Sequence, residues 1–231
     1  MIDKAPSPFS LITQDRFIAR RSLLNQALLV AGGAAVAGFP AADALAQPKE
    51  GAQYRTLKPA APVDSAGKIE LVEFFWYGCP HCRDLEPVLK EWLKKLPADV
   101  SFKKMHVNFQ EIKHQQLFFT LQAMGKAEAL SDKVFYGIHI EKNRLDTPAR
   151  MTDYLAPLGV DKAEFLKMFE SFSVKTLQGR ATKLMEAYKV DGVPAFGVNG
   201  KYYTSPSMSG GNEAALKTVQ HLIDLERNAK K

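Results

Sequence analysis

Cysteine is scarce in this chain of 231 residues, which contains only Cys79 and Cys82. Two thiols exclude a scaffold held by several disulfides and a metal site with four thiolate ligands. Charge of one sign is not concentrated either, because 31 Lys and Arg residues are interspersed with 25 Asp and Glu residues. Proteins that bind nucleic acid usually cluster their positive charge, so we expect no nucleic-acid partner. A mean hydropathy of −0.19 excludes a polytopic membrane protein.

Apolar stretches long enough to span a bilayer are missing too. The run Leu23–Phe39 has an uninterrupted apolar core of about 13 residues, whereas a membrane span needs about 20. Arg20 and Arg21 precede this run, and the small residues of Ala44–Ala46 follow it. This pattern predicts a secretory signal peptide over residues 1–46, and the arginine pair resembles a twin-arginine signal. The alternative is an uncleaved anchor helix.

The segment that follows, residues 47–110, is typical of an α/β protein. A short strand is expected near Tyr54–Leu57, and the β-branched and aromatic run Ile69–Trp76 predicts a buried strand. Apolar residues recur every three to four positions over Pro80–Lys95, which predicts an amphipathic helix. Val100–Phe109 again has the composition of a strand. Strand, helix and strand together indicate a βαβ unit.

A helical block over residues 111–188 interrupts this α/β pattern. Thr147 and Asp161 are typical helix N-caps, and Gly125 and Gly159 are typical helix ends. The predicted helices are Lys113–Met124, Leu130–Ile140, Thr147–Leu158, Lys162–Ser171 and Ser173–Tyr188.

The last segment, residues 189–231, returns to the α/β pattern. It contains a predicted hairpin of Val193–Val198 and Lys201–Tyr203 around the turn Asn199-Gly200, followed by the amphipathic helix Asn212–Arg227. The order βαβ, helices, ββα predicts an α/β fold in which a helical domain is inserted between two halves of a small sheet.

The chemistry is concentrated in Cys79-Pro80-His81-Cys82, at the junction of a predicted strand and helix. Cys79 lies at the helix N-terminus, where free backbone N–H groups and the helix dipole lower a thiol pKa. Pro80 suits the first helical turn, and His81 adds positive charge beside the thiolate. We therefore predict Cys79 as nucleophile and Cys82 as the resolving cysteine. A stabilised thiolate favours the reduced form, so the pair should donate its disulfide to a substrate dithiol.

Three other interpretations of the cysteine pair compete with this one. A structural disulfide across two residues closes a ring too small to stabilise the fold much. Half of a zinc site would need further ligands, and His81, His106 and His114 lack a clear ligand spacing, so His106 and His114 are interpreted as structural. Chance placement at a strand–helix junction of an exported chain is the third. We expect no metal and no cofactor.

Further candidate residues lie near the cysteines in the predicted fold. Pro194 stands at the entrance of a strand, and a cis bond there would leave the backbone of Val193 free to pair with an extended peptide; an ordinary turn proline is the alternative. Glu73 lies six residues before Cys79 and can relay protons, with Lys104 as its partner. A paired or edge carboxylate and a solvated lysine are the alternatives.

Aromatic residues before the cysteines complete the candidate site. Trp76 and Tyr77 are predicted to line an apolar groove for a peptide, although Trp76 is equally suited to the core. Extended binding through backbone groups would make the substrate range broad. No long apolar edge is evident, so we expect a monomer.

The chain resembles the DsbA family of thiol:disulfide interchange proteins. The resemblance is carried by Glu73–Phe75, the tetrad Cys79–Cys82, Lys104–Phe109, Gly192–Ala195 and Val198–Tyr202, in the same order as in that family. It implies a thioredoxin fold with an inserted helical domain, located in the periplasm.

The resemblance also implies roles and partners. It assigns Cys79 and Cys82 as the redox pair, Pro194 as the cis-proline, and Glu73 with Lys104 as a buried charged pair. The implied substrates are unfolded or folding exported proteins with free cysteines, and the implied reoxidant is a DsbB-like, quinone-linked membrane oxidase. A reductase or isomerase is the alternative within redox chemistry, and a peptide-binding holdase is the alternative outside it.

Overall fold

The computed structural model describes residues 47–65 and 67–229, so the predicted signal peptide, residues 1–46, lies outside the described ranges. A mixed five-stranded sheet with the order β1-β5-β4-β2-β3 organises this part of the chain. β2 pairs with β3 in parallel and with β4 in antiparallel, and β5 pairs antiparallel with both β4 and β1. The strands are β1 Tyr54–Thr56, β2 Ile69–Phe75, β3 Val100–His106, β4 Ala195–Val198 and β5 Tyr202–Thr204.

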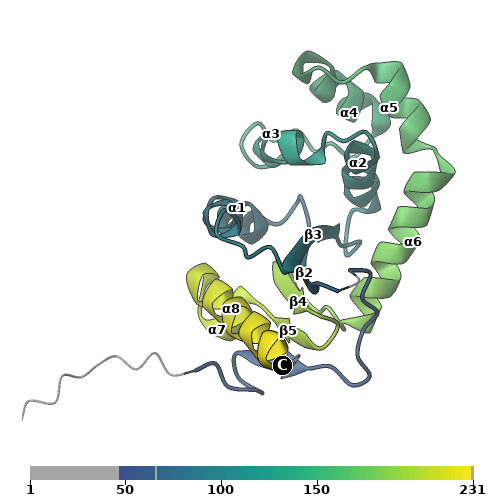
Figure 1. Ribbon diagram of the computed structural model, residues 1–231. Coiled ribbons are helices and arrows are strands. Elements are labelled where there is room, and N and C mark those ends of the chain that lie inside the picture. Colours follow the sequence, from purple (N-terminus) through teal and green to yellow (C-terminus); the bar gives the residue numbers. More distant parts are fainter. Residues whose placement is uncertain (1–46, 66, 230–231) are drawn as a thin grey trace, which may run out of the picture. The chain divides into compact units, whose positions relative to one another are not determined.

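Helices pack on the sheet (Figure 1). In sequence, a series of helices follows β3 and precedes β4. α1 connects β2 to β3, and α8 ends the described chain. Five α-helices and a short 3₁₀ helix lie between β3 and β4 in sequence. The helices are α1 Pro80–Leu93, α2 Ile112–Ala123, α3 Ala127–His139, α4 Pro148–Leu155, the 3₁₀ turn Ala156–Leu158, α5 Lys162–Phe169, α6 Phe172–Ala187, α7 Pro206–Ser209 and α8 Asn212–Ala229.

The interior strand β2 separates two apolar layers because its side chains alternate between the faces of the sheet. Ile69 and Leu71 pack with residues of α1 and α8, whereas Val72 and Phe74 pack with the C-terminal part of α6. All seven residues of β2 are buried. Such burial on both faces explains why the run reads as continuously apolar apart from two glutamates.

Most predicted elements are present, and their caps explain where the helices begin and end. The side chains of Thr147 and Asp161 accept N–H bonds from the residues three positions later, at the start of α4 and α5. Gly125 and Gly159 adopt the left-handed conformation that ends a helix. No helix among the described residues is long and apolar enough to cross a membrane.

Several boundaries differ from the prediction. β3 ends at His106 rather than Phe109, and α3 begins at Ala127 rather than Leu130. β4 begins only at Ala195, because Pro194 has no N–H and cannot donate a ladder hydrogen bond. The four-residue helix α7 was not predicted. Its N-cap, Ser205, is followed by a proline, a start signal that its short length conceals.

Candidate active site

A tight turn carries the chain from β2 to the cysteine pair. The backbone N–H of Cys79 donates to the carbonyl of Trp76 at 3.0 Å. Pro80 is the first residue of α1. Cys79 is therefore the N-cap residue of α1, with an extended backbone (φ −89°, ψ 117°). Its side chain keeps 7% of its surface exposed, whereas Cys82 is fully buried. Cys79 is the cysteine that a substrate can reach.

Hydrogen bonds at the helix N-terminus stabilise the Cys79 thiolate. The thiol of Cys82 donates to its sulfur, and the backbone N–H groups of Cys82 and His81 add to this, as does the charge of His81. Together they outweigh partial burial and lower the pKa of Cys79 from 9.0 to about 6. Burial raises the pKa of Cys82 far above its usual value, and the neighbouring Cys79 raises it further. The two sulfurs thus differ sharply in acidity.

The loop before β4 contacts Cys79. The peptide bond between Val193 and Pro194 is cis, and the Cys79 thiol donates to the carbonyl oxygen of Val193 at 3.5 Å. These residues are more than a hundred positions apart in sequence. The fold therefore brings together the predicted nucleophile and the predicted peptide-binding loop.

Three charged side chains form a buried cluster on the side of the sheet that faces α1. Glu73 of β2 and Lys104 of β3 are register partners, and Lys104 Nζ lies 3.3 Å from Glu73 Oε2. The same ammonium group donates to Glu86 of α1. Glu73 is fully buried, and Glu86 is only 4% exposed. The predicted pair of Glu73 and Lys104 is thus a triad.

Burial controls the protonation of this triad. It raises the pKa of Glu73 to about 7, against the opposing effect of Lys104 and with a further rise from Glu86. Burial alone would lower the pKa of Lys104, but Glu73 and Glu86 raise it above its usual value. The charge of Glu73 also contributes to the raised pKa of Cys82. A carboxyl that titrates near neutral pH therefore interacts with the buried sulfur.

Glu86 was missed by the sequence analysis. It lies four residues after Cys82, so both project from the same face of α1. This spacing was the available signal, and it was overlooked because a glutamate within an amphipathic helix is usually solvated.

The aromatic residues before Cys79 are placed differently from one another. Trp76 is partly buried and packs against two apolar clusters, and its ring lies so close to Gly78 that a Cβ there would be 2.3 Å away. Tyr77 is fully buried, so the prediction that it lines a groove is wrong.

The histidines outside the tetrad are held by the fold. His106 Nε2 accepts from the backbone N–H of Tyr77 at 3.1 Å, and its Nδ1 donates to the Val107 carbonyl at 2.7 Å. Burial lowers the pKa of His106 to about 3. His114 Nε2 donates to the Arg144 carbonyl at 2.7 Å. Both ring nitrogens of His106 are thus hydrogen-bonded, whereas His114 is bonded through Nε2 alone and its Nδ1 has no partner among the described residues.

An acidic cysteine at a helix N-terminus, a shielded second cysteine one turn later and a cis-proline loop facing them define a thiol:disulfide oxidoreductase. The chain matches the family model of the DSBA-like thioredoxin domain over residues 70–223. It belongs to this family, which confirms the predicted thioredoxin fold, class of enzyme and resemblance.

Known relatives extend the match over most of the chain. The thiol:disulfide interchange protein DsbA of Pseudomonas aeruginosa is 46% identical over 183 residues, which are 78% of this chain and 87% of the relative. The crystal structure of P. aeruginosa DsbA superimposes with a TM-score of 0.77 at 45% identity, covering 80% of this chain and 97% of that one. DsbA from Xylella fastidiosa gives 0.73 at 25% identity, covering 78% and 98%.

Proposed function

We propose that the protein oxidises exported polypeptides by transferring the Cys79–Cys82 disulfide to them. A substrate thiolate attacks the Cys79 sulfur, the Cys79–Cys82 bond breaks, and a mixed disulfide joins Cys79 to the substrate. A second substrate thiolate attacks the substrate sulfur of this bond and expels Cys79 as a thiolate. The substrate loses two electrons and the cysteine pair gains them. The single observation that supports this direction is the lowered pKa of Cys79, the more accessible of the two cysteines, at the N-terminus of α1.

The buried charged triad serves the proton that the first step requires. Cys82 leaves as a thiolate in a site that raises its pKa, so it must take up a proton at once. Glu73 has a pKa of about 7, so near neutral pH a fraction of the protein molecules carries a protonated Glu73 that can supply this proton. Lys104 connects the two buried carboxylates to solvent, because it is ion-paired with both Glu73 and Glu86 and its own side chain is 19% exposed. Glu73 is therefore the proposed proton donor and acceptor for Cys82.

The cis-proline loop is the proposed docking site of the substrate backbone. The carbonyl of Val193 lies beside Cys79, and Pro194 has no N–H to compete for the substrate strand. Pairing through backbone groups gives broad selectivity, as oxidation of many different polypeptides requires. Trp76, which packs against Gly78 at the same turn, supplies apolar contact. His81 and Pro80 form the start of the helix that stabilises the thiolate.

The wider setting follows from the predicted leader. Residues 1–46 act as a signal peptide that delivers the protein to the periplasm, where it works as a monomer. A DsbB-like, quinone-linked membrane oxidase removes the two electrons and restores the disulfide. Residues 47–110 and 189–231 form the thioredoxin-like domain, and residues 111–188 form the inserted helical domain.

Two measurements test this function. The reduction potential of the pair, from equilibration with glutathione buffers, should lie well above the value of about −270 mV typical of thioredoxin and towards about −120 mV. The variant Cys82→Ala should accumulate mixed disulfides with exported proteins, and Cys79→Ser should form none. A potential near that of thioredoxin would indicate a reductase instead. Protection of unfolded proteins that survives in Cys79→Ser would indicate a holdase.

A further inference from the structure

Tyr77 connects the active-site turn to two different parts of the fold. It lies two residues before Cys79 and is fully buried. Its backbone N–H donates to His106 Nε2 of β3 at 3.1 Å, and its carbonyl accepts from His139 Nε2 of α3 at 2.8 Å. Its hydroxyl shares a 3.0 Å hydrogen bond with Ser131 Oγ, also of α3. Every polar group of this residue is therefore tied to a neighbouring element.

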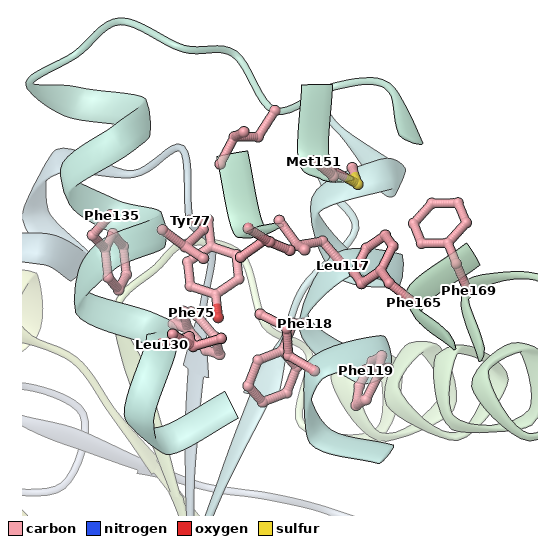
Figure 2. Packing of buried hydrophobic residues seen from close by; sticks show 14 of the residues in the cluster. Phe75, Tyr77, Leu117, Phe118, Phe119, Leu130, Phe135, Met151, Phe165 and Phe169 are labelled. Atoms are coloured by element: carbon pink, nitrogen blue, oxygen red, sulfur yellow. The ribbon is translucent and has the colours of Figure 1, made fainter. Parts of the chain in front are cut away.

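The ring of Tyr77 is held as firmly as its polar groups. It packs edge-on against Phe75, Phe118 and Phe135, with ring centroids 5.2, 6.2 and 5.1 Å away. Figure 2 shows the ring within this aromatic cluster, between Phe135 and Phe118. Since Phe118 belongs to α2 and Phe135 to α3, the helices inserted after β3 surround a residue of the active-site turn.

Two histidines bind the backbone of Tyr77, one as an acceptor and the other as a donor. His106 donates from Nδ1 to the Val107 carbonyl, which leaves its Nε2 as an acceptor for the N–H of Tyr77. His139 Nε2 faces a carbonyl oxygen and therefore carries a proton. The backbone N–H and carbonyl of Tyr77 are thus bound by two different elements, β3 and α3.

The turn itself transmits the position of Tyr77 to Cys79. Tyr77 and Gly78 are the two central residues of the turn that the bond from the Cys79 N–H to the Trp76 carbonyl closes. Gly78 has no room for a side chain, because the ring of Trp76 occupies the place of its Cβ. The position of Tyr77 therefore determines where Cys79 lies relative to the N–H groups at the start of α1.

We propose that Tyr77 is a positioning residue, through which α3 holds Cys79 at the N-terminus of α1 and so makes the disulfide more oxidising. This proposal rests on the proposed function, in which the stabilised Cys79 thiolate sets the direction of electron flow. Loosening the contacts of Tyr77 with α3 lets Cys79 move away from the N–H groups of His81 and Cys82. The reduced form then loses stability relative to the disulfide.

The proposal is tested by the equilibrium constant of the full-length protein with glutathione. Tyr77→Phe removes only the hydroxyl bond to Ser131, and His139→Leu removes the donor to the Tyr77 carbonyl. His139→Gln keeps an N–H donor at similar reach and serves as the rescue variant. Tyr154→Phe is the matched control, because it loses a hydroxyl bond to another residue of α3, the Lys133 carbonyl, at 2.6 Å.

We expect Tyr77→Phe and His139→Leu each to make the disulfide less oxidising by about threefold to tenfold in this constant, where tenfold equals about 30 mV for a two-electron couple. His139→Gln should recover most of the change, and Tyr154→Phe should show none. Alkylation at rising pH should place the Cys79 pKa higher in the two affected variants. Thermal unfolding of the same samples reports the purely structural effect.

Two outcomes overturn the proposal. In the first, the wild-type disulfide is strongly oxidising, and Tyr77→Phe and His139→Leu have the same equilibrium constant with glutathione as the wild type, even if both variants unfold at lower temperature. The other is an equal change in Tyr154→Phe, which would show a general response to loss of a hydroxyl bond. Failure of the proposed function is distinct, because the wild-type pair would then itself be as reducing as thioredoxin.

Discussion

The reduction potential of the cysteine pair should change its pH dependence near pH 6. Reducing the disulfide takes two electrons and, at low pH, two protons. The pKa of Cys79 is about 6, so above that pH its thiolate binds no proton, while Cys82 stays protonated because its pKa is raised. Each proton contributes about 30 mV per pH unit for a two-electron couple. The slope should therefore fall from about −60 to about −30 mV per pH unit.

The size of the stabilisation follows from the same shift. A thiol whose pKa is lowered in the folded protein stabilises that state fully above its ordinary pKa of 9.0, and the effect is lost as the pH falls through about 6. About three pKa units correspond to about 4 kcal/mol above pH 9, and screening by water at this partly accessible sulfur reduces the figure to about 2–4 kcal/mol. At pH 7 only about one unit acts, which is about 1.4 kcal/mol or about 30 mV.

The assay equilibrates the protein with glutathione buffers between about pH 5 and about pH 9 and measures the reduced fraction after acid quenching and alkylation. The ultraviolet absorbance of the thiolate gives the pKa of Cys79 independently. The matched variant His81→Gln removes the charge that helps to lower this pKa, so its break should move to higher pH. A single slope of about −60 mV per pH unit up to pH 8 in the wild type would refute the reasoning.

Three further variants test separate parts of the structure. Glu73→Gln removes the carboxyl with a pKa of about 7, so turnover at pH 7.5 should fall at least about tenfold and its profile should lose the inflection near pH 7. Arg55→Ala removes one of two side-chain contacts of Asp191, the 3.2 Å pair of Arg55 Nη1 with Asp191 Oδ2, and leaves the bond from the Tyr203 hydroxyl. It should loosen the loop before Pro194 and raise KM severalfold for a peptide dithiol with kcat little changed. Gly197→Ala places a Cβ 2.2 Å from the buried ring of Tyr188 and should lower the free energy of unfolding in urea by about 1–3 kcal/mol.

Each of these variants has an outcome that contradicts its reasoning. An unchanged pH profile in Glu73→Gln would place the proton donor elsewhere. Arg150→Ala, which breaks an exposed pair with Asp146, is the control for Arg55→Ala, and equal KM values in all three proteins would remove the loop from substrate binding. Gly179→Ala is the control for Gly197→Ala, because a Cβ at Gly179 meets nothing within 4 Å, and equal free energies of unfolding in the two variants would contradict the argument.

The redox pair and the fold class could be predicted because local chemistry determines them. A proline and a histidine between two cysteines, after a β-branched strand and before an amphipathic helix, define a helix N-terminus without tertiary information. The sequence analysis inferred that a cis bond at Pro194 would leave the Val193 backbone free to pair with a peptide, but it did not predict the contact of Val193 with Cys79. The structure contains that bond, and the Val193 carbonyl lies 3.5 Å from the Cys79 sulfur.

Tertiary contacts account for what the sequence analysis missed. The triad required Glu86 to meet Lys104, and the helical spacing of Glu86 from Cys82 does not reveal which strand lies beneath α1. The sequence predicted Tyr77 to be an exposed groove residue, because an aromatic residue beside an active site usually binds ligand. Its burial depends on Phe118 and Phe135, which belong to helices whose packing could not be derived from sequence patterns.

These missed contacts concern one physical problem, which is how to keep a reactive thiolate in place without covering it. Cys79 must stay accessible to meet a substrate, and although it packs in an apolar cluster it keeps 7% of its surface exposed. The fold also fixes the residues on either side, because Tyr77 is hydrogen-bonded to β3 and α3 and Cys82 is fully buried. The helices inserted after β3 therefore contribute to the chemistry as well as to the surface, because they determine where the turn before Cys79 lies.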